Sequence, residues 1–198
     1  MTGIRLERLI GDRLKAHLPE LARLRITVFR DFPYLYDGSL DYEERYLRTY
    51  AAAADSVVVG AFDGERVVGA STGLPLEHEP DSLKAPFAER GYRPEEIFYF
   101  GESVLLPEYR GHGIGVGFFK EREAHASGLG RFTHAAFCGV VRPPDHSRRP
   151  PGYVPLDAFW RKRGYEPVPG LVGHLSWQDL DEPAESPKPM QFWIKRLT

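Results

Sequence analysis

The segment whose residue types point most clearly to a chemical role contains alternating glycines. Gly111, Gly113, Gly115 and Gly117 follow an apolar stretch and open a segment with helical character. Glycine allows positive φ and lets the backbone come close to a ligand. The first turn of a helix adds free N–H groups and the positive end of the helix dipole, a combination that favours phosphate or pyrophosphate. The segment therefore predicts an anion-binding turn, and a tight turn without a ligand is the alternative.

Two common phosphate motifs are excluded by spacing. A P-loop needs a lysine directly after its last glycine, but Lys120 follows Phe119. A dinucleotide fingerprint needs a third glycine at the sixth position, which is Val116 counted from Gly111 and Phe118 counted from Gly113. What remains is the pattern R-x-x-G-x-G at residues 110–115.

Residues 104–115 resemble the acetyl-coenzyme A signature of the GNAT superfamily of N-acetyltransferases, in which an apolar strand leads into P-E-Y-R-G-x-G-I-G at a helix start. Residues 159–165, F-W-R-K-R-G-Y, are similar to the family's Y-x-x-x-G-F signature. The order of helices and strands upstream agrees as well, so the resemblance covers nearly the whole chain. It implies an α/β fold with a mixed, largely antiparallel central sheet flanked by helices, and acetyl-coenzyme A as cosubstrate.

The resemblance also implies which residues hold the coenzyme. The backbone of Ser103, Val104 and Leu105 would bind the pantetheine arm and present an amide to the thioester carbonyl. The residues that would wrap the pyrophosphate are Arg110, Gly111, His112, Gly113, Ile114, Gly115 and Val116. Residues 103–165 contain ten Lys or Arg against five Asp or Glu. That excess suits an anionic ligand, and solvated helix faces account for it equally well.

Glu102 is the candidate general base. Acetyl transfer to an amine requires a neutral nitrogen, a polarised carbonyl and a proton for the leaving thiolate. Glu102 directly precedes the implied acetyl site and resembles the acid that several family members use as base. With Phe100 and Val104 as neighbours, we expect apolar surroundings and a raised pKa. A structural ion pair with an arginine is the alternative.

Trp160 is the main departure from the family pattern. The family usually has a tyrosine four residues before the motif glycine, where it protonates the thiolate, but here Trp160 precedes Gly164 by four. An indole cannot donate through oxygen, so we expect Trp160 to pack against the pantetheine or the core. Tyr153, in the loop just ahead, is a candidate proton donor, and water is the alternative.

The other reactive side chains give weaker evidence of a function. Cys138 lies within an apolar strand and is expected to fill the core rather than act as nucleophile. The seven histidines show neither H-x-x-x-H nor H-E-x-x-H spacing, so no metal site is expected. Residues 142–155 hold five prolines and form a loop with no clear family counterpart. We expect its polar residues to be exposed, with Asp145 steering a cationic acceptor as the alternative.

The elements that must position these residues are predicted from periodicity. A helix capped by Asp12 runs to residue 29, or divides into two at Pro19, and an aromatic loop over residues 29–38 follows it. The loop coincides with the family's acceptor side, which favours a small or partly apolar amine. The other predicted helices cover 41–54, 81–90, 115–127 and 156–163. The predicted strands cover 4–9, 57–62, 66–73, 97–106, 132–141, 172–177 and 191–197, with a turn over 179–189.

Length, composition and net charge limit the classes of protein to which the chain can belong. The chain has 198 residues, 42% of them hydrophobic, and a net charge of −2, which is typical of a globular protein. That charge argues against a nucleic-acid partner, the single cysteine excludes a disulfide scaffold, and no apolar run is long enough for a membrane span or signal peptide. We expect one domain over residues 1–198 in the cytoplasm, with a homodimer left open.

These observations lead to one functional hypothesis and one alternative. The hypothesis is an N-acetyltransferase that moves an acetyl group from acetyl-coenzyme A to an amine of a small molecule or peptide, by direct attack in a ternary complex. The alternative is a non-catalytic module that binds or senses acyl-coenzyme A. The slightly acidic remainder of the chain makes a cationic acceptor the better expectation.

Overall fold

One mixed sheet organises the computed structural model, which describes residues 3–197. Its strand order is β1-β2-β3-β4-β6-β8-β7, with β5 paired to β3 off this path. Every pairing is antiparallel except that of β4 with β6. The predicted α/β fold with a largely antiparallel sheet is confirmed. The strands are β1 (Arg5–Leu9), β2 (Val57–Asp63), β3 (Arg66–Pro75), β4 (Ile97–Tyr99), β5 (Ser103–Leu105), β6 (His134–Val140), β7 (Glu166–Trp177) and β8 (Ser186–Arg196).

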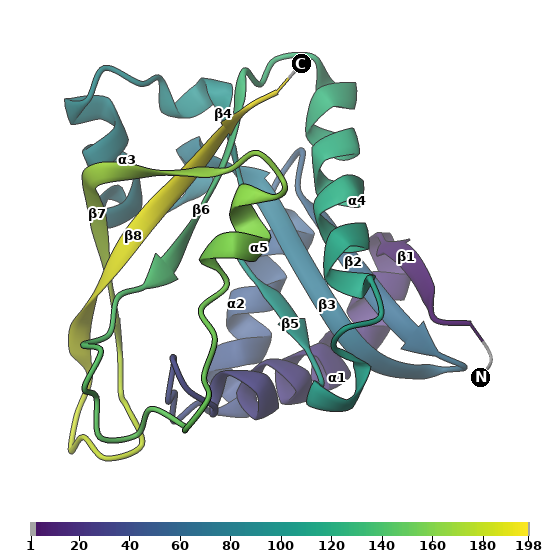
Figure 1. Ribbon diagram of the computed structural model, residues 1–198. Coiled ribbons are helices and arrows are strands. Elements are labelled where there is room, and N and C mark those ends of the chain that lie inside the picture. Colours follow the sequence, from purple (N-terminus) through teal and green to yellow (C-terminus); the bar gives the residue numbers. More distant parts are fainter. Residues whose placement is uncertain (1–2, 198) are drawn as a thin grey trace.

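Helices cover both faces of the sheet (Figure 1). Side chains alternate along β2, so Val58 packs toward one face while Val57 and Val59 pack toward the other. The first face carries α1 (Gly11–Phe29), α2 (Leu40–Ala52) and α3 (Asp81–Glu89). The second face carries α4 (Ile114–Leu129) and α5 (Asp157–Arg161). Short 3₁₀ turns lie at Leu76–His78, Pro94–Glu96 and Pro107–Tyr109.

The first helix is continuous, so the two-helix alternative is wrong. Helix α1 passes through Pro19 because Leu14, Leu18 and Leu21 form one buried stripe against the sheet, which outweighs the lost hydrogen bond. The helix begins at Gly11, so Asp12 is not its cap but lies in the first turn. Among residues 3–197 no helix combines the length and the apolar character that crossing a membrane requires.

The predicted single strand over 97–106 is wrong, and the difference shapes the site. Strand β4 pairs in parallel with β6, the last matched residues being Tyr99 and Ala136. Strand β4 also pairs with β3, and after a break at residues 100–102, β5 pairs with β3 again. Strand β6 pairs with β8 from His134 to Val140, so past Ala136 it continues along β8 without β4. Strands β5 and β6 therefore diverge, and a gap opens between them in the middle of the sheet.

A buried arginine from α4 holds this break in place. Arg122 is 1% exposed, and its Nη1 donates to the carbonyl oxygens of Thr72 at 3.1 Å and Glu102 at 2.9 Å. Its Nη2 donates to the Ser103 hydroxyl at 2.8 Å, and its guanidinium lies 4.2 Å from the centre of the Phe100 ring. Burial lowers the pKa of Arg122 to about 10. Both carbonyl groups also accept backbone hydrogen bonds, from the N–H groups of Gly101 and Thr72, so Arg122 is a second donor that ties the two sides of the break together.

The final hairpin is longer than predicted. The predicted turn extended to residue 189, but β8 begins at Ser186 and contains Pro187 and Pro189. Pro189 accepts a hydrogen bond from the Val141 N–H at 2.9 Å, so its nitrogen faces the β6 side of β8. Pairing with β6 stops at Met190. Proline is tolerated there because no ladder donor is needed.

We predict that Arg122→Met destabilises the fold by about 2–4 kcal/mol, because methionine keeps most of the side-chain volume but removes the buried hydrogen bonds to the Thr72 and Glu102 carbonyl groups and to the Ser103 hydroxyl. Lys120→Met, at an exposed position of the same helix, should change stability by no more than about 0.5 kcal/mol. Urea unfolding of both variants measures this. Equal stabilities would show that Arg122 does not hold the break.

Candidate active site

A cavity of about 520 Å³ lies on the α1 and α2 face of the sheet. It is bounded by α1 and α2, by Gly101 and Glu102 in the break between β4 and β5, and by Cys138 of β6. Seven aromatic side chains, four carboxylates and two guanidinium groups line it. The aromatic loop at residues 30–38 and the end of β7 form its outer wall.

Glu102 faces this cavity and is 9% exposed. Its Oε1 forms an ion pair with Arg25 of α1, and its Oε2 accepts a hydrogen bond from the Tyr46 hydroxyl at 3.0 Å. The Tyr46 hydroxyl lies 2.8 Å from that of Tyr50, so a chain of hydroxyl groups leads away from Glu102. The expected apolar surroundings are therefore wrong, and the alternative, an arginine partner, is present.

Arg25 joins two buried carboxylates. Its Nε is hydrogen bonded to Glu43 of α2 and its Nη1 is paired with Glu102. Burial opposes the charge of Arg25, but the two carboxylates raise its pKa well above the ordinary value. Glu43 is fully buried, and its Oε1 has no hydrogen-bond partner among the described residues. One guanidinium thus serves two carboxylates.

Glu79 is a third carboxylate near the break, positioned just after the 3₁₀ turn Leu76–His78. It is half-buried and faces the Tyr50 hydroxyl. Burial raises the pKa of Glu79 to about 7, and the charge of Glu102 adds to the effect. Glu79 is therefore the carboxylate in this region whose charge changes near neutral pH.

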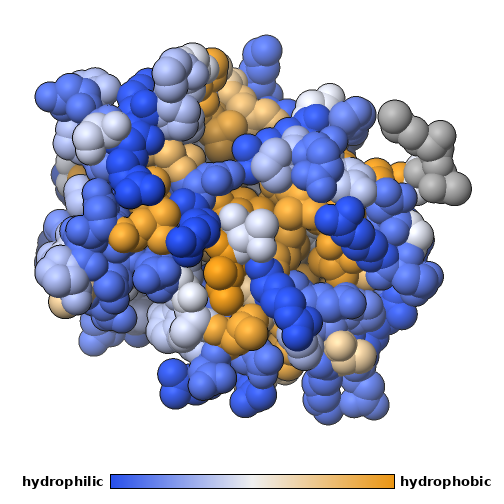
Figure 2. Space-filling model, turned by 90° about the horizontal axis from the view of Figure 1, so that it is seen from below, coloured by the Kyte–Doolittle hydropathy of each residue, from blue (hydrophilic) through white to orange (hydrophobic). Residues whose placement is uncertain are grey.

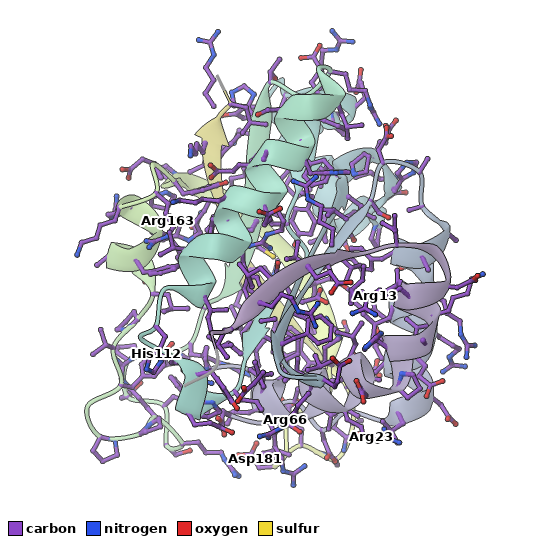
Figure 3. All side chains as sticks on the ribbon, turned by 90° about the vertical axis from the view of Figure 1, so that its right-hand side faces the viewer. Arg13, Arg23, Arg66, His112, Arg163 and Asp181 are labelled. Carbon is purple, nitrogen blue, oxygen red and sulfur yellow. The ribbon has the colours of Figure 1, made fainter. Side chains whose placement is uncertain are left out.

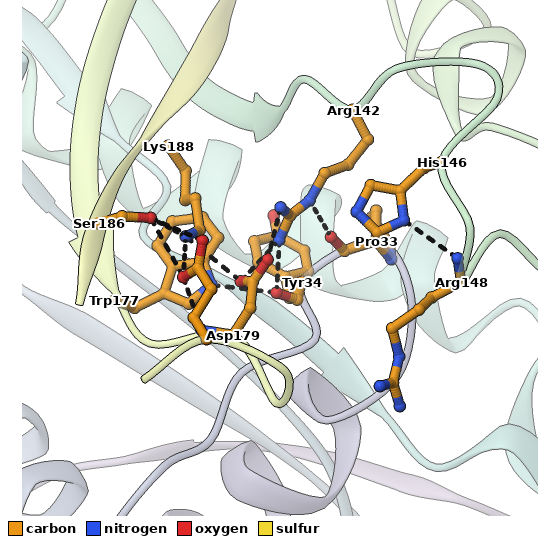
Figure 4. A network of polar contacts seen from close by, with 10 residues as sticks. Pro33, Tyr34, Arg142, His146, Arg148, Trp177, Asp179, Ser186 and Lys188 are labelled. Carbon is orange, nitrogen blue, oxygen red and sulfur yellow. Dashed lines mark hydrogen bonds and ion pairs between the residues drawn. The ribbon is translucent and has the colours of Figure 1, made fainter. Parts of the chain in front are cut away.

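A polar network ties down the outer wall of the cavity (Figure 4). Arg142 binds Asp179 through both Nη atoms, at 2.7 and 2.9 Å. It also donates to the carbonyl oxygens of Pro33 at 2.7 Å and Tyr34 at 2.8 Å. Lys188 lies 3.7 Å from Asp179 on the other side. The expectation that the polar residues of loop 142–155 are exposed is wrong for Arg142, which links this loop, the aromatic loop and the β7–β8 turn.

The start of α4 has the features of an anion site. Gly111 and Gly113 both have φ of 81°, and a Cβ at either would meet nothing within 4 Å. Gly113 caps the helix without a side-chain hydrogen bond, and the first turn has no acidic residue. The N–H groups of Ile114, Gly115 and Val116 therefore point out of the helix end toward open space. Arg110 is exposed beside them and donates to the Leu105 carbonyl at 3.3 Å.

The residues around this turn fit a phosphate-bearing coenzyme. Figure 3 places His112 and Arg163 along the same side of α4. The guanidinium of Arg163 lies 3.4 Å from the centre of the Phe159 ring, which itself packs near Gly115. The Arg163 Nε is buried without a hydrogen-bond partner in the described part of the chain. A second hollow of about 660 Å³ beside β1 contains Asp63 and Glu108, so an anion is better placed on the Arg163 side.

The other predicted residues lie apart from Glu102. Trp160 packs on Phe137 and Trp193 with ring centres 5.1 and 5.0 Å away, directly over Gly139 of β6. Tyr153 packs edge-on against Phe32 at 4.7 Å and does not line the cavity.

Cys138 does line the cavity, 3.0 Å from the Tyr99 hydroxyl, and burial raises its pKa to about 12. Among residues 3–197 no group of three His, Cys, Asp or Glu side chains is placed to hold a metal ion.

Sequence reasoning missed Arg25, Glu43 and Tyr46. The sequence did contain a signal for these residues, because Arg25 continues the apolar stripe that Leu14, Leu18 and Leu21 form along α1. Glu43 likewise precedes the buried residues of α2 by one helical turn. A charged residue within an apolar stripe indicates a buried polar pair.

No model of a known family matches the sequence, and no curated protein matches it. Solved structures do match over nearly the full length. An acetyltransferase of the GNAT family from Streptococcus pneumoniae has 11% identity and a TM-score of 0.59, over 99% of this chain and 100% of the other. A ribosomal-protein-alanine N-acetyltransferase from Brucella melitensis has 18% identity and a TM-score of 0.61, over 98% and 99%.

A third match is yncA from Salmonella typhimurium, whose structure contains its cofactor acetyl-CoA. It has 8% identity and a TM-score of 0.62, over 100% of this chain and 95% of the other. The chain therefore has the fold of the GNAT acetyltransferases, and the resemblance inferred from its motifs is confirmed at the level of fold.

We predict that Glu79→Gln alters the pH dependence of stability. Because the folded state raises the pKa of Glu79 from 4.5 to about 7, its stabilising contribution is complete below pH 4.5 and is lost as the pH rises through 7. Glutamine cannot ionise, so the variant does not lose stability in this way. Relative to the native protein, its free energy of unfolding should therefore be about 2 kcal/mol higher at pH 8 than at pH 5. Urea unfolding at both values measures the difference. Glu89→Gln, at an exposed position, should show none, and an equal offset at both pH values for Glu79→Gln would contradict the prediction.

Proposed function

We propose that the protein is an N-acetyltransferase that transfers the acetyl group of acetyl-coenzyme A to an amine of a small molecule or peptide. The observation that carries this proposal is the gap between β5 and β6. These strands diverge between a glycine-rich helix start without a side-chain cap on one face of the sheet and a cavity containing Glu102 on the other. Two substrates approaching from opposite faces would meet there.

The chain's own residues would hold the coenzyme in three places. On the side of β5 turned toward the gap, the backbone groups of Ser103 and Leu105 would bind the pantetheine arm, whereas Val104 between them pairs with Ala70 of β3. Trp160, over Gly139, borders the same gap from α5. The pyrophosphate would bind the turn formed by Arg110, Gly111, His112, Gly113, Ile114, Gly115 and Val116.

The thioester supplies an activated acetyl group when the coenzyme is bound. The amine nitrogen forms a bond to the acetyl carbon as the carbon–sulfur bond breaks, the nitrogen loses one proton and the thiolate gains one. We assign the first proton to Glu102, whose oxygens are oriented by Arg25 and Tyr46. Tyr153 or water supplies the second. Burial raises the pKa of Cys138 to about 12, which supports direct attack in a ternary complex over a covalent intermediate on that thiol.

A non-catalytic module that binds acyl-coenzyme A is the second candidate. Two observations favour it, the tryptophan at position 160 and the engagement of Glu102 with Arg25. Release of free thiol from acetyl-coenzyme A in the presence of amines separates the two functions, because only the enzyme couples thiol release to formation of an amide.

We predict that Gly113→Glu weakens coenzyme A binding by about 100-fold, since it places a negative charge and a strained φ at the proposed pyrophosphate turn. Gly91→Glu is a matched control, because Gly91 also has positive φ, of 80°, and open space around it. Isothermal titration calorimetry measures both affinities. An unchanged affinity in Gly113→Glu would move the pyrophosphate away from this turn.

We predict that Glu102→Gln lowers kcat/KM by about 100-fold, because glutamine keeps the shape of the side chain but cannot accept a proton. Glu20→Gln, an exposed change on α1, should leave kcat/KM unaltered. A steady-state thiol-release assay measures both variants, and calorimetry checks that Glu102→Gln still binds coenzyme A. An unaltered kcat/KM in Glu102→Gln would remove Glu102 as the base.

A further inference from the structure

The cavity around Glu102 has a chemical character that goes beyond acetyl transfer, and the inference below rests on the proposed function. Its aromatic lining comes from α1, α2, the loop at residues 30–38 and the ends of β4 and β7. These residues are Phe29, Tyr34, Tyr36, Tyr42, Tyr46, Tyr99 and Trp177. Leu175 and Met190 add apolar surface. Such a lining suits a ligand with an apolar body of about one ring rather than a hydroxyl-rich sugar.

The cavity is lined by more carboxylates than guanidinium groups. Asp37, Glu43, Glu102 and Glu185 face two guanidinium groups, those of Arg25 and Arg45. Arg45 is exposed, so Arg25 is the buried cation, and both Glu43 and Glu102 already contact it. The interior therefore has an excess of negative charge, which attracts a cation and repels a carboxylate-bearing ligand.

Glu43 provides a specific docking atom. The side chain is fully buried and lines the cavity, and only its Oε2 is engaged by Arg25. The Oε1 is without a hydrogen-bond partner among residues 3–197, and the nearby Tyr36 hydroxyl has a pKa that is raised by burial and then by the charge of Glu43 and a hydrogen-bond interaction with its carboxylate. A buried carboxylate oxygen without a donor is unfavourable, and an ammonium N–H would satisfy it.

The aromatic rings already hold cations in this region. The guanidinium of Arg25 lies 4.2 Å from the centre of the Tyr46 ring and 5.1 Å from that of Phe29. On the outer wall, Arg142 and Lys188 each lie 5.8 Å from the Trp177 ring. Cations over ring faces gain electrostatic energy when water is excluded. The remaining tyrosine faces extend the same environment to a ligand.

We infer that the acceptor is a primary amine that is protonated in solution and has an apolar body about the size of one aromatic ring. Its ammonium group binds the Oε1 of Glu43. The guanidinium group of Arg25 links Glu43 to Glu102. The amine loses one proton to Glu102 before its nitrogen attacks the acetyl carbon, and it loses a second proton as the carbon–sulfur bond breaks and the leaving thiolate gains a proton. Anionic amino acids and amino sugars are excluded as preferred acceptors. Figure 2 views the molecule from the end that holds the aromatic loop, loop 142–155 and the start of α4, and apolar side chains are exposed there between hydrophilic ones.

Four probes of the native protein with coenzyme A bound test this inference. Phenethylamine is the cation, 2-phenylethanol its neutral counterpart, phenylacetate its anionic counterpart and glucosamine a polar cation. Isothermal titration calorimetry at pH 7.5 should give phenethylamine an affinity at least about tenfold above that of each other probe. An equal or higher affinity for any of the other three would overturn the inference, as would no detectable binding of phenethylamine.

The variant Glu43→Gln tests the docking atom. We expect its KM for phenethylamine to rise about tenfold while its affinity for coenzyme A is unchanged, whereas Glu44→Gln on the same helix changes neither. An unchanged KM in a folded Glu43→Gln variant would overturn the assignment of Glu43, and if that variant does not fold, the four-probe series on the native protein decides.

Failure of the inference and failure of the proposed function are distinguishable. If thiol release occurs but is fastest with glucosamine or with phenylalanine, the acceptor class is wrong and acetyl transfer stands. If phenethylamine binds but no amine in the series releases thiol from acetyl-coenzyme A, the cation site stands and the enzyme proposal fails.

Discussion

Everything in the site depends on the break between β4 and β5, which two arginines hold from opposite faces of the sheet. Arg122 of α4 binds the backbone carbonyl of Glu102, and Arg25 of α1 binds its carboxylate. Both β4 and β5 pair with β3, but only β4 pairs with β6, so the contact with β6 ends at the break. The same residue is thus fixed by its backbone on one side and by its side chain on the other, and the gap to β6 remains open between them.

The two faces that meet at this gap have opposite electrostatic characters. The start of α4 offers uncapped N–H groups and exposed Arg110, which suits an anion. The opposite cavity has more carboxylates than guanidinium groups and suits a cation. The excess of basic residues in the second half of the chain is only partly available to a ligand, because Arg122, Arg131 and Arg142 are engaged with carbonyls and carboxylates of the protein itself. The positions of the charged residues, rather than the net charge of the chain, therefore distinguish the proposed coenzyme side from the proposed acceptor side.

Local signals were enough to predict much of the fold. The Asp63-Gly64 turn placed the hairpin of β2 and β3, and the glycines before Ile114 placed the start of α4, because turn and cap geometry depend on neighbouring residues. The break at residues 100–102 was not predictable in the same way. It depends on the end of the pairing with β6, while the pairing with β3 resumes in β5, and on Arg122, which is 20 residues away from Glu102. The partners of Glu102 on α1 and α2 are likewise long-range contacts, and only the charged positions within apolar helical stripes pointed toward them.

The central claim is that the gap between β5 and β6 is where coenzyme and acceptor meet. A crystal structure of the protein with coenzyme A tests it most directly. We predict that the pantetheine arm lies against the β6-facing side of β5, with the pyrophosphate at the start of α4 and the thiol opening into the cavity that contains Glu102. A coenzyme bound elsewhere, or a thiol that does not reach that cavity, would contradict the account.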